Sequence, residues 1–85
     1  MASYDLLINR SARKELESLP SKDCTRVTKK ILALAENPRP AGAEKLSGEE
    51  KYRIRQGDYR VLYAIDDGSK QVTVVKIGHR EDVYR

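Results

Sequence analysis

The sequence predicts an α+β fold in which an N-terminal strand and a two-helix hairpin pack on a twisted antiparallel sheet of about four strands. Apolar residues recur at helical spacing as far as residue 35, and from residue 51 they alternate with polar residues as in strands. Of the 85 residues, 39% are hydrophobic, which is enough for one compact two-layer core. We therefore expect residues 1–85 to form a single domain.

The first half of the chain supplies one strand and two helices. Residues 4–8 are expected to form the strand. Ser11 can cap the first helix, and Pro20 should stop it. Ser21 can cap a second helix, which should end at the Asn-Pro pair at 37–38. The apolar face of this helix carries Cys24, Val27, Ile31, Leu34 and Ala35.

The second half supplies the rest of the sheet. Residues 39–48, rich in proline and glycine, are expected to be mostly loop. Residues 51–56 and 59–65 should form a hairpin around a two-residue turn, whose first residue, a glycine, suits type II′. After a turn at 66–70, residues 71–78 form a valine-rich strand.

The two-residue turn fixes which side chains share a face of the hairpin. It sets Arg55 opposite Arg60 with Arg53 on the same face, although like charges directly opposite destabilise a sheet. If Ile65 pairs with Gln71, the next strand adds basic residues to this face. The expected cluster is Arg53, Arg55, Arg60, Lys76 and Arg80, with Lys76 opposite Arg60.

This cluster has two interpretations. A solvated outer face of a sheet is ordinarily charged, but it usually mixes both signs. None of the five positions is a carboxylate, although the chain has 13 Asp and Glu against 17 Lys and Arg. We therefore favour an anion site that fits the phosphates of a nucleic acid.

A second basic stripe lies on the second helix. It consists of Lys22, Arg26, Lys29 and Lys30, at helical spacing opposite the apolar face. One interpretation is an ordinary solvent-exposed helix face. The other is a surface that docks to the backbone of a structured RNA.

Three runs of sequence carry a family resemblance. They are the segment Tyr-Arg-Ile-Arg at 52–55, Gly-Asp-Tyr-Arg-Val-Leu-Tyr at 57–63, and Ile-Gly-His-Arg-Glu-Asp-Val-Tyr-Arg at 77–85. Together with the Lys-Leu pair at 45–46, they resemble the RelE branch of the RelE/ParE toxin superfamily over the whole chain. The resemblance implies cleavage of messenger RNA on the ribosome and inhibition by a RelB-like antitoxin protein. It also implies catalytic roles for Arg53, Arg55, Arg60, Arg80 and Tyr84, beside RNA-binding lysines at Lys45, Lys51 and Lys76.

The expected chemistry uses the 2′-hydroxyl of RNA as its own nucleophile. Tyr84 is the candidate base, since nearby cations favour the phenolate of a group whose ordinary pKa is about 10. Arg60 would hold the phosphate and Arg80 would assist the leaving oxygen, while the strand arginines orient the backbone. His79, the single histidine, is a further candidate contributor. One histidine and no clustered carboxylates predict no metal or other cofactor.

The sequence leaves two alternatives open. One is a ParE-like toxin of the same fold that inhibits DNA gyrase. The other is a non-catalytic RNA-binding module. A single cysteine and the absence of an apolar run of about 20 residues indicate a cytoplasmic protein with no membrane segment.

Overall fold

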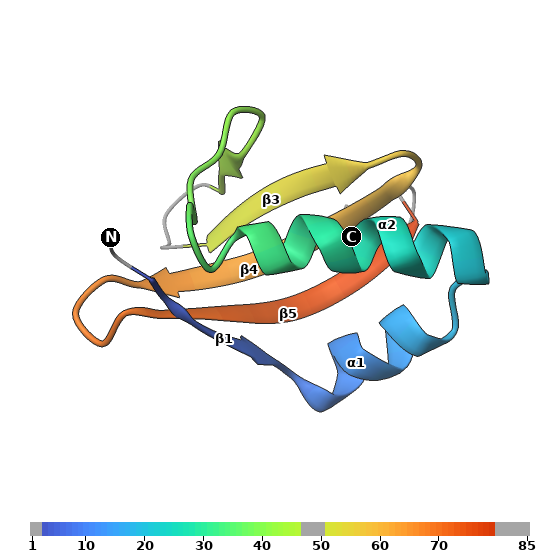
Figure 1. Cartoon of the computed structure of the whole chain (residues 1–85), viewed down its shortest axis with the longest axis horizontal. Helices are drawn as coiled ribbons and strands as arrows, with labels where there is room; N and C mark the ends of the chain where they lie inside the picture. Colours follow the sequence, from blue (N-terminus) through green and yellow to red (C-terminus); the bar gives the residue numbers. More distant parts are fainter. Residues whose placement is uncertain (1–2, 47–50, 80–85) are drawn as a thin grey trace.

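The computed structural model describes residues 3–46 and 51–79, and shows two helices on one face of a five-stranded sheet (Figure 1). The elements in chain order are β1 (Asp5–Ile8), α1 (Arg10–Glu17), α2 (Ser21–Ala33), β2 (Glu44–Lys45), β3 (Lys51–Gln56), β4 (Tyr59–Asp66) and β5 (Gln71–His79). The strand order is β1-β5-β4-β3-β2. The predicted α+β architecture is confirmed.

The sheet differs from the prediction in two respects. It is mixed, because β1 runs parallel to β5, with Leu6 beside Val72 and Ile8 beside Val74. It also gains β2, two residues long, which pairs with β3 inside the segment expected to be loop. Neither pairing has a local signal, because both join segments that are distant in sequence or too short to show alternation.

Both helices begin slightly earlier than predicted, because neither Ser11 nor Ser21 is the N-cap residue. The backbone N–H of Arg13 donates to the carbonyl of Asn9 at 2.9 Å, so Asn9 is the cap of α1. The N–H of Cys24 donates in the same way to Pro20 at 2.8 Å. Pro20, which lacks an N–H, therefore stops one helix and caps the next.

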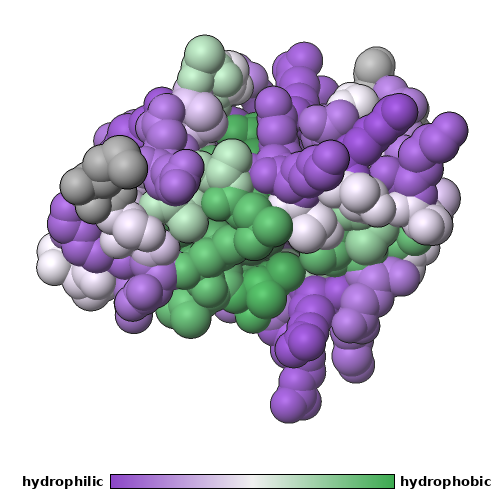
Figure 2. Space-filling model, in the orientation of Figure 1, coloured by the Kyte–Doolittle hydropathy of each residue, from purple (hydrophilic) through white to green (hydrophobic). Residues whose placement is uncertain are grey.

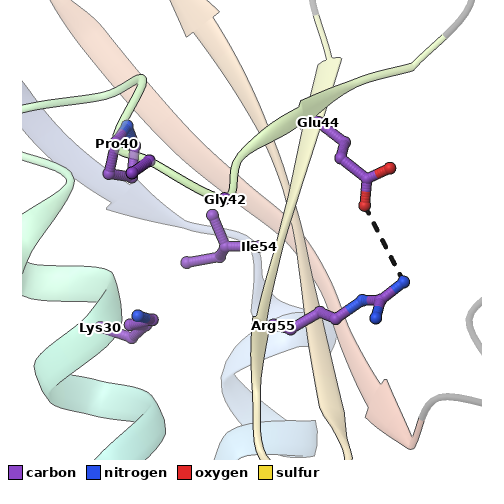
Figure 3. A pocket seen from close by; sticks show the side chains of 7 residues that line it. Lys30, Pro40, Gly42, Glu44, Ile54 and Arg55 are labelled. Atoms are coloured by element: carbon purple, nitrogen blue, oxygen red, sulfur yellow. Dashed lines mark ion pairs between the residues drawn. The ribbon is translucent and has the colours of Figure 1, made fainter.

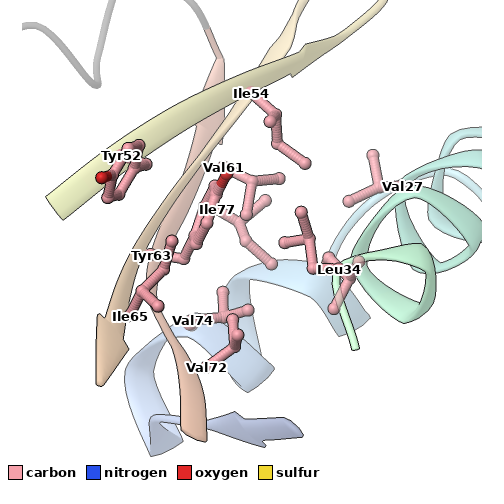
Figure 4. Close-up of a cluster of buried hydrophobic side chains, with 12 residues drawn as sticks. Val27, Leu34, Tyr52, Ile54, Val61, Tyr63, Ile65, Val72, Val74 and Ile77 are labelled. Carbon is pink, nitrogen blue, oxygen red and sulfur yellow. The ribbon is translucent and has the colours of Figure 1, made fainter. Parts of the chain in front are cut away.

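The core lies between the helices and the sheet (Figure 4). Val27 on α2 and Leu34, the residue directly after this helix, are fully buried against strand side chains that point toward the helices. These strand residues are Tyr52, Ile54, Val61, Tyr63, Ile65, Val72, Val74 and Ile77. Because successive strand residues point to opposite faces, this core fixes what the other face must carry.

The β3–β4 hairpin has the predicted register, with Arg55 opposite Arg60 and Ile54 opposite Val61. Gly57 has φ +60°, the left-handed conformation that a type II′ turn requires at its first position.

The β4–β5 hairpin departs from its predicted register. Asp66 pairs with Gln71, and an irregularity between Leu62 and Tyr63 leaves Val75 as an extra residue. Lys76 therefore lies opposite Leu62 rather than Arg60, which faces Gly78. Without the extra residue, Lys76 would pair with Val61 and point toward the helices. The bulge thus keeps this lysine on the predicted face.

Neither helix in the described part of the chain is long and apolar enough to cross a membrane.

Candidate nucleic-acid interface

The sheet face directed away from the helices is strongly basic. Register places Arg53, Arg55, Arg60 and Lys76 on it, together with Lys51, and we call this surface the arginine face. The intervening residues Ile54 and Val61 are buried in the core, which fixes the outward direction of their neighbours. The structure thus brings together four of the five residues predicted to form the cluster.

Two arginines of this face are largely buried. Arg60 is 6% exposed and Arg53 is 9% exposed, whereas the side chain of Arg55 is 57% exposed. A buried charge is costly unless it is paired and hydrogen-bonded, and for Arg53 a carboxylate on β2 supplies such a partner at 2.8 Å. A held cation that need not reorganise is suited to stabilising charge that develops on a phosphate.

Glu44, on β2, belongs to the arginine face, and no pattern in the sequence indicates it. Its Oε1 accepts a hydrogen bond from Nη2 of Arg53 at 2.8 Å and lies 3.9 Å from Nη2 of Arg55. The hydrogen bond from Arg53, with the charges of Arg53, Arg55 and Arg60, lowers the pKa of Glu44. The face therefore includes a carboxylate that stays ionised and orients its neighbour.

Glu15, on α1, contacts the arginine face at β5, on the side away from Glu44. Its Oε1 accepts a hydrogen bond from the backbone N–H of Ile77 at 3.0 Å, and its Oε2 lies 3.6 Å from Nζ of Lys76. Because β1 pairs with β5 only as far as Val74, this carboxylate satisfies a backbone donor beyond the paired segment. Lys76 is thus drawn toward the sheet edge, away from the two opposed arginines.

The other strand and loop candidates divide between the two faces. Lys51 pairs with Ala64 and shares the arginine face. Lys45 pairs with Tyr52 and belongs to the opposite face. His79 pairs with Tyr59, and their rings meet edge to face at 5.9 Å between centroids. The register therefore sets His79 on the opposite side of the sheet from Arg60.

The described tyrosines of β3 and β4 lie on the helix side, as the sequence predicts. Tyr52 stacks on Tyr63 with ring centroids 5.8 Å apart. Burial raises the pKa of Tyr63 to about 12, and its hydroxyl donates to the carbonyl of Pro38 at 2.7 Å. Burial, with the nearby carboxylate of Asp23, also raises the pKa of Tyr59. All three therefore face away from the arginine face.

The basic stripe on α2 is a separate surface. Lys22, Arg26, Lys29 and Lys30 are all exposed, and α2 covers the face of the sheet opposite the arginines. Figure 2 shows hydrophilic side chains gathered over the N-terminal part of this helix. The structure thus leaves most of the stripe apart from the arginine face.

Lys30 is the member of the stripe that comes near the sheet edge. It lines a cavity of ≈ 330 Å³ between α2, the 40–42 loop and β3 (Figure 3). The cavity is also lined by Pro40, Gly42, Glu44, Ile54 and Arg55. The sequence patterns did not indicate this cavity, because three separate segments form it.

Arg80 and Tyr84 lie outside the described residues, so their proposed roles remain predictions. Among residues 3–46 and 51–79, no group of three or more His, Cys, Asp or Glu residues is placed to hold a metal ion.

Sequence comparison finds relatives over nearly the whole chain. The sequence model of the family described as "ParE toxin of type II toxin-antitoxin system, parDE" matches residues 6–84. The toxin RelE of Mycobacterium tuberculosis is 34% identical over 96% of this chain and 87% of its own length. The mRNA interferase toxin RelE of Escherichia coli is 33% identical over 96% of this chain and 90% of its own.

Solved structures agree with the fold. A chain in the crystal structure of the toxin–antitoxin complex RelBE2 from Mycobacterium tuberculosis superposes with a TM-score of 0.82 and 29% identity. The match covers 94% of each chain.

Proposed function

This chain belongs to the RelE/ParE family of type II toxins, and from that premise we propose that it is an endoribonuclease that cleaves messenger RNA on the ribosome. The observation that carries the proposal is the pairing of Arg55 with Arg60 across the hairpin. A sheet accepts two like charges in direct opposition at a cost, and a phosphodiester bound between them would offset it.

The proposed reaction uses the 2′-hydroxyl next to the scissile phosphate and needs no metal. The 2′-oxygen forms a bond to phosphorus as the bond from phosphorus to the 5′-oxygen breaks. The proton of the 2′-hydroxyl passes to a base, and the 5′-oxygen gains a proton as it leaves. The products are a 2′,3′-cyclic phosphate and a 5′-hydroxyl.

The proposed roles follow from burial and position. Arg60, largely buried, would bind the phosphate, and the exposed Arg55 would contact the same phosphate from the neighbouring strand. Arg53, oriented by Glu44, would stabilise charge from the adjacent position. Arg80 on the leaving side and Tyr84 as base complete the set, as the family resemblance implies.

The partners we propose are the ribosome with its messenger RNA, in the cytoplasm, and a RelB-like antitoxin. The RelBE2 toxin of Mycobacterium tuberculosis was crystallised in a toxin–antitoxin complex. A surface with several arginines suits an acidic protein segment as well as it suits RNA, because both present anionic oxygens. Such a partner would block the arginine face.

The decisive experiment measures messenger RNA cleavage in a purified translation system by mapping new 5′ ends. Arg60→Ala should lower the cleavage rate by roughly 100- to 1000-fold, because it removes a charge-stabilising donor. Arg13→Ala is the matched control, since Arg13 is exposed on α1 and pairs only weakly with Glu17 at 3.7 Å. Arg55→Ala, at an exposed site, gives a second test if Arg60→Ala lowers stability.

A gyrase-directed toxin is the competing function, because the family description names ParE. It predicts intact messages and arrested supercoiling by purified DNA gyrase. A non-catalytic binding module predicts salt-sensitive RNA affinity with no new 5′ ends. Either result with the wild-type protein contradicts the proposed nuclease.

A further inference from the structure

The cavity beside β3 has the size of a site for one small ligand. Its volume of ≈ 330 Å³ lies at the low end of ligand pockets, which run from roughly 300 to 1,000 Å³. Gly42, at φ +92°, sets the path of the loop that forms one wall. The cavity adjoins the arginine face, because Arg55 and Glu44 belong to both (Figure 3).

The lining combines three kinds of group. Pro40 offers an apolar surface against which a flat ring can pack, above Ile54, which is only 3% exposed and forms the floor of the cavity. Lys30 on α2 and Arg55 on β3 line the cavity from two sides, and the Arg55 side chain extends from the edge of β3 toward Glu44 (Figure 3). Glu44 adds a hydrogen-bond acceptor. An apolar wall, two cations and an acceptor match a nucleotide, which has a flat base, a phosphate and N–H donors on its edge.

The backbone of β3 adds to this set. In the described residues β2 pairs with β3 only at Tyr52 and Arg53, so the strand edge beyond Arg53 has no neighbouring strand. Outward-facing peptide groups alternate along an antiparallel strand, and those of Lys51 face β2, since Leu46 donates to the Lys51 carbonyl at 2.8 Å. The same alternation directs the peptide groups of Arg55 toward the cavity side.

We propose that this cavity binds the nucleotide adjacent to the scissile phosphate in single-stranded RNA. The base packs on Pro40, and its phosphate lies at the edge of β3, within reach of Lys30 and Arg55. The inference rests on the proposed RNA cleavage and adds a subsite to it. It also gives Lys30 a role distinct from that of the other basic residues on α2.

The test uses an uncleavable RNA trinucleotide with 2′-O-methyl groups, followed by NMR of the backbone amides. The trinucleotide should shift the signals of Gly42 and Ile54, whereas inorganic phosphate, and an abasic trinucleotide with the same phosphates, should not. Lys30→Ala should weaken trinucleotide binding roughly tenfold, the effect of losing one charged hydrogen bond. Lys14→Ala, which removes the same charge from exposed α1, should bind as the wild type does.

The outcomes separate this inference from the proposed function. If messenger RNA is cut while the Gly42 and Ile54 signals stay still, or if the abasic analogue moves them equally, the subsite is wrong and the nuclease stands. If the Gly42 and Ile54 signals shift and Lys30→Ala weakens binding while no RNA is cut, the subsite is supported and the proposed nuclease activity is refuted. If the wild-type protein binds no trinucleotide, the subsite is overturned as well.

Discussion

Glu44 is the residue whose position decides how the arginine face presents its charge. It holds Arg53 at 2.8 Å and lies at 3.9 Å from Arg55, so it orients one cation and only partly offsets the other. Removal of its charge would leave the face more attractive to any anion and its geometry less fixed. Affinity and catalysis should therefore respond in opposite directions to a change at this residue.

Glu44→Gln tests that separation. The neutral amide should raise the affinity for uncleavable RNA roughly two- to fivefold at low salt, the size expected of one exposed charge pair. The cleavage rate of bound RNA should fall, because Arg53 loses the carboxylate that orients it. Binding by fluorescence anisotropy and single-turnover cleavage measure the two effects. Glu36→Gln, at an exposed carboxylate in the turn after α2, is the control. Equal affinity in the two variants would refute the assignment.

At the scale of elements, the turn at Gly57 sets the register on which the arginine pair depends. Its φ of +60° is accessible to glycine, and a Cβ built there meets nothing within 4 Å. The cost of alanine at this position is therefore one of backbone conformation and not of packing.

Gly57→Ala should lower the free energy of unfolding by roughly 1–2 kcal/mol, the cost of a left-handed conformation for a residue with Cβ. Gly68→Ala is the matched control, since Gly68 does not have a positive φ and its added Cβ would lie 3.4 Å from Asp66 Oδ1. Urea unfolding curves give both values. Equal losses in the two variants would mean that the conformation at residue 57 is not what stabilises the hairpin.

Some strand pairings could be predicted from the sequence and others could not, for reasons that lie in the elements themselves. Alternation and a two-residue turn fix the β3–β4 register locally, so the opposition of Arg55 and Arg60 was predictable. The bulge at Val75 could not be predicted, because no local pattern marks an extra residue in a strand. The parallel β1–β5 pairing could not be predicted either, because it joins segments that are distant in sequence. Glu44 reaches the site for the same reason: a two-residue strand carries no pattern of its own.

Across the molecule as a whole, one network of hydrogen bonds and an ion pair connects four segments at the end of the β3–β4 hairpin away from Gly57. Arg39, in the loop after α2, donates through Nη1 and Nη2 to Asp67, in the β4–β5 turn, at 3.2 and 2.9 Å. Its Nε donates to the hydroxyl of Tyr52 at 3.0 Å. Tyr4, ahead of β1, donates to Asp67 Oδ1 at 2.7 Å. The network anchors the N-terminal segment and the loop to the sheet.

This network makes stability depend on acidity in a definite direction. Hydrogen bonds from Arg39 and Tyr4 lower the pKa of Asp67 from 3.8 to about 2. A carboxylate with a lowered folded-state pKa stabilises the fold above its unfolded-state pKa and loses that effect as the pH falls through the folded-state value. Asp67→Asn should therefore be less stable than the wild type at neutral pH, and the gap should close as the pH falls from about 4 to about 2.

Arg39→Met separates this network from the general acid sensitivity of the other carboxylates. Without the guanidinium that contributes most to the lowered pKa of Asp67, this variant should lose most of the same pH-dependent difference from the wild type. The two substitutions combined should add little to either one, because each removes one partner of the same contact. Urea midpoints at several pH values measure all four proteins. A gap that stays constant as the solution is acidified, or additive losses in the double variant, would show that Arg39 and Asp67 stabilise the fold independently.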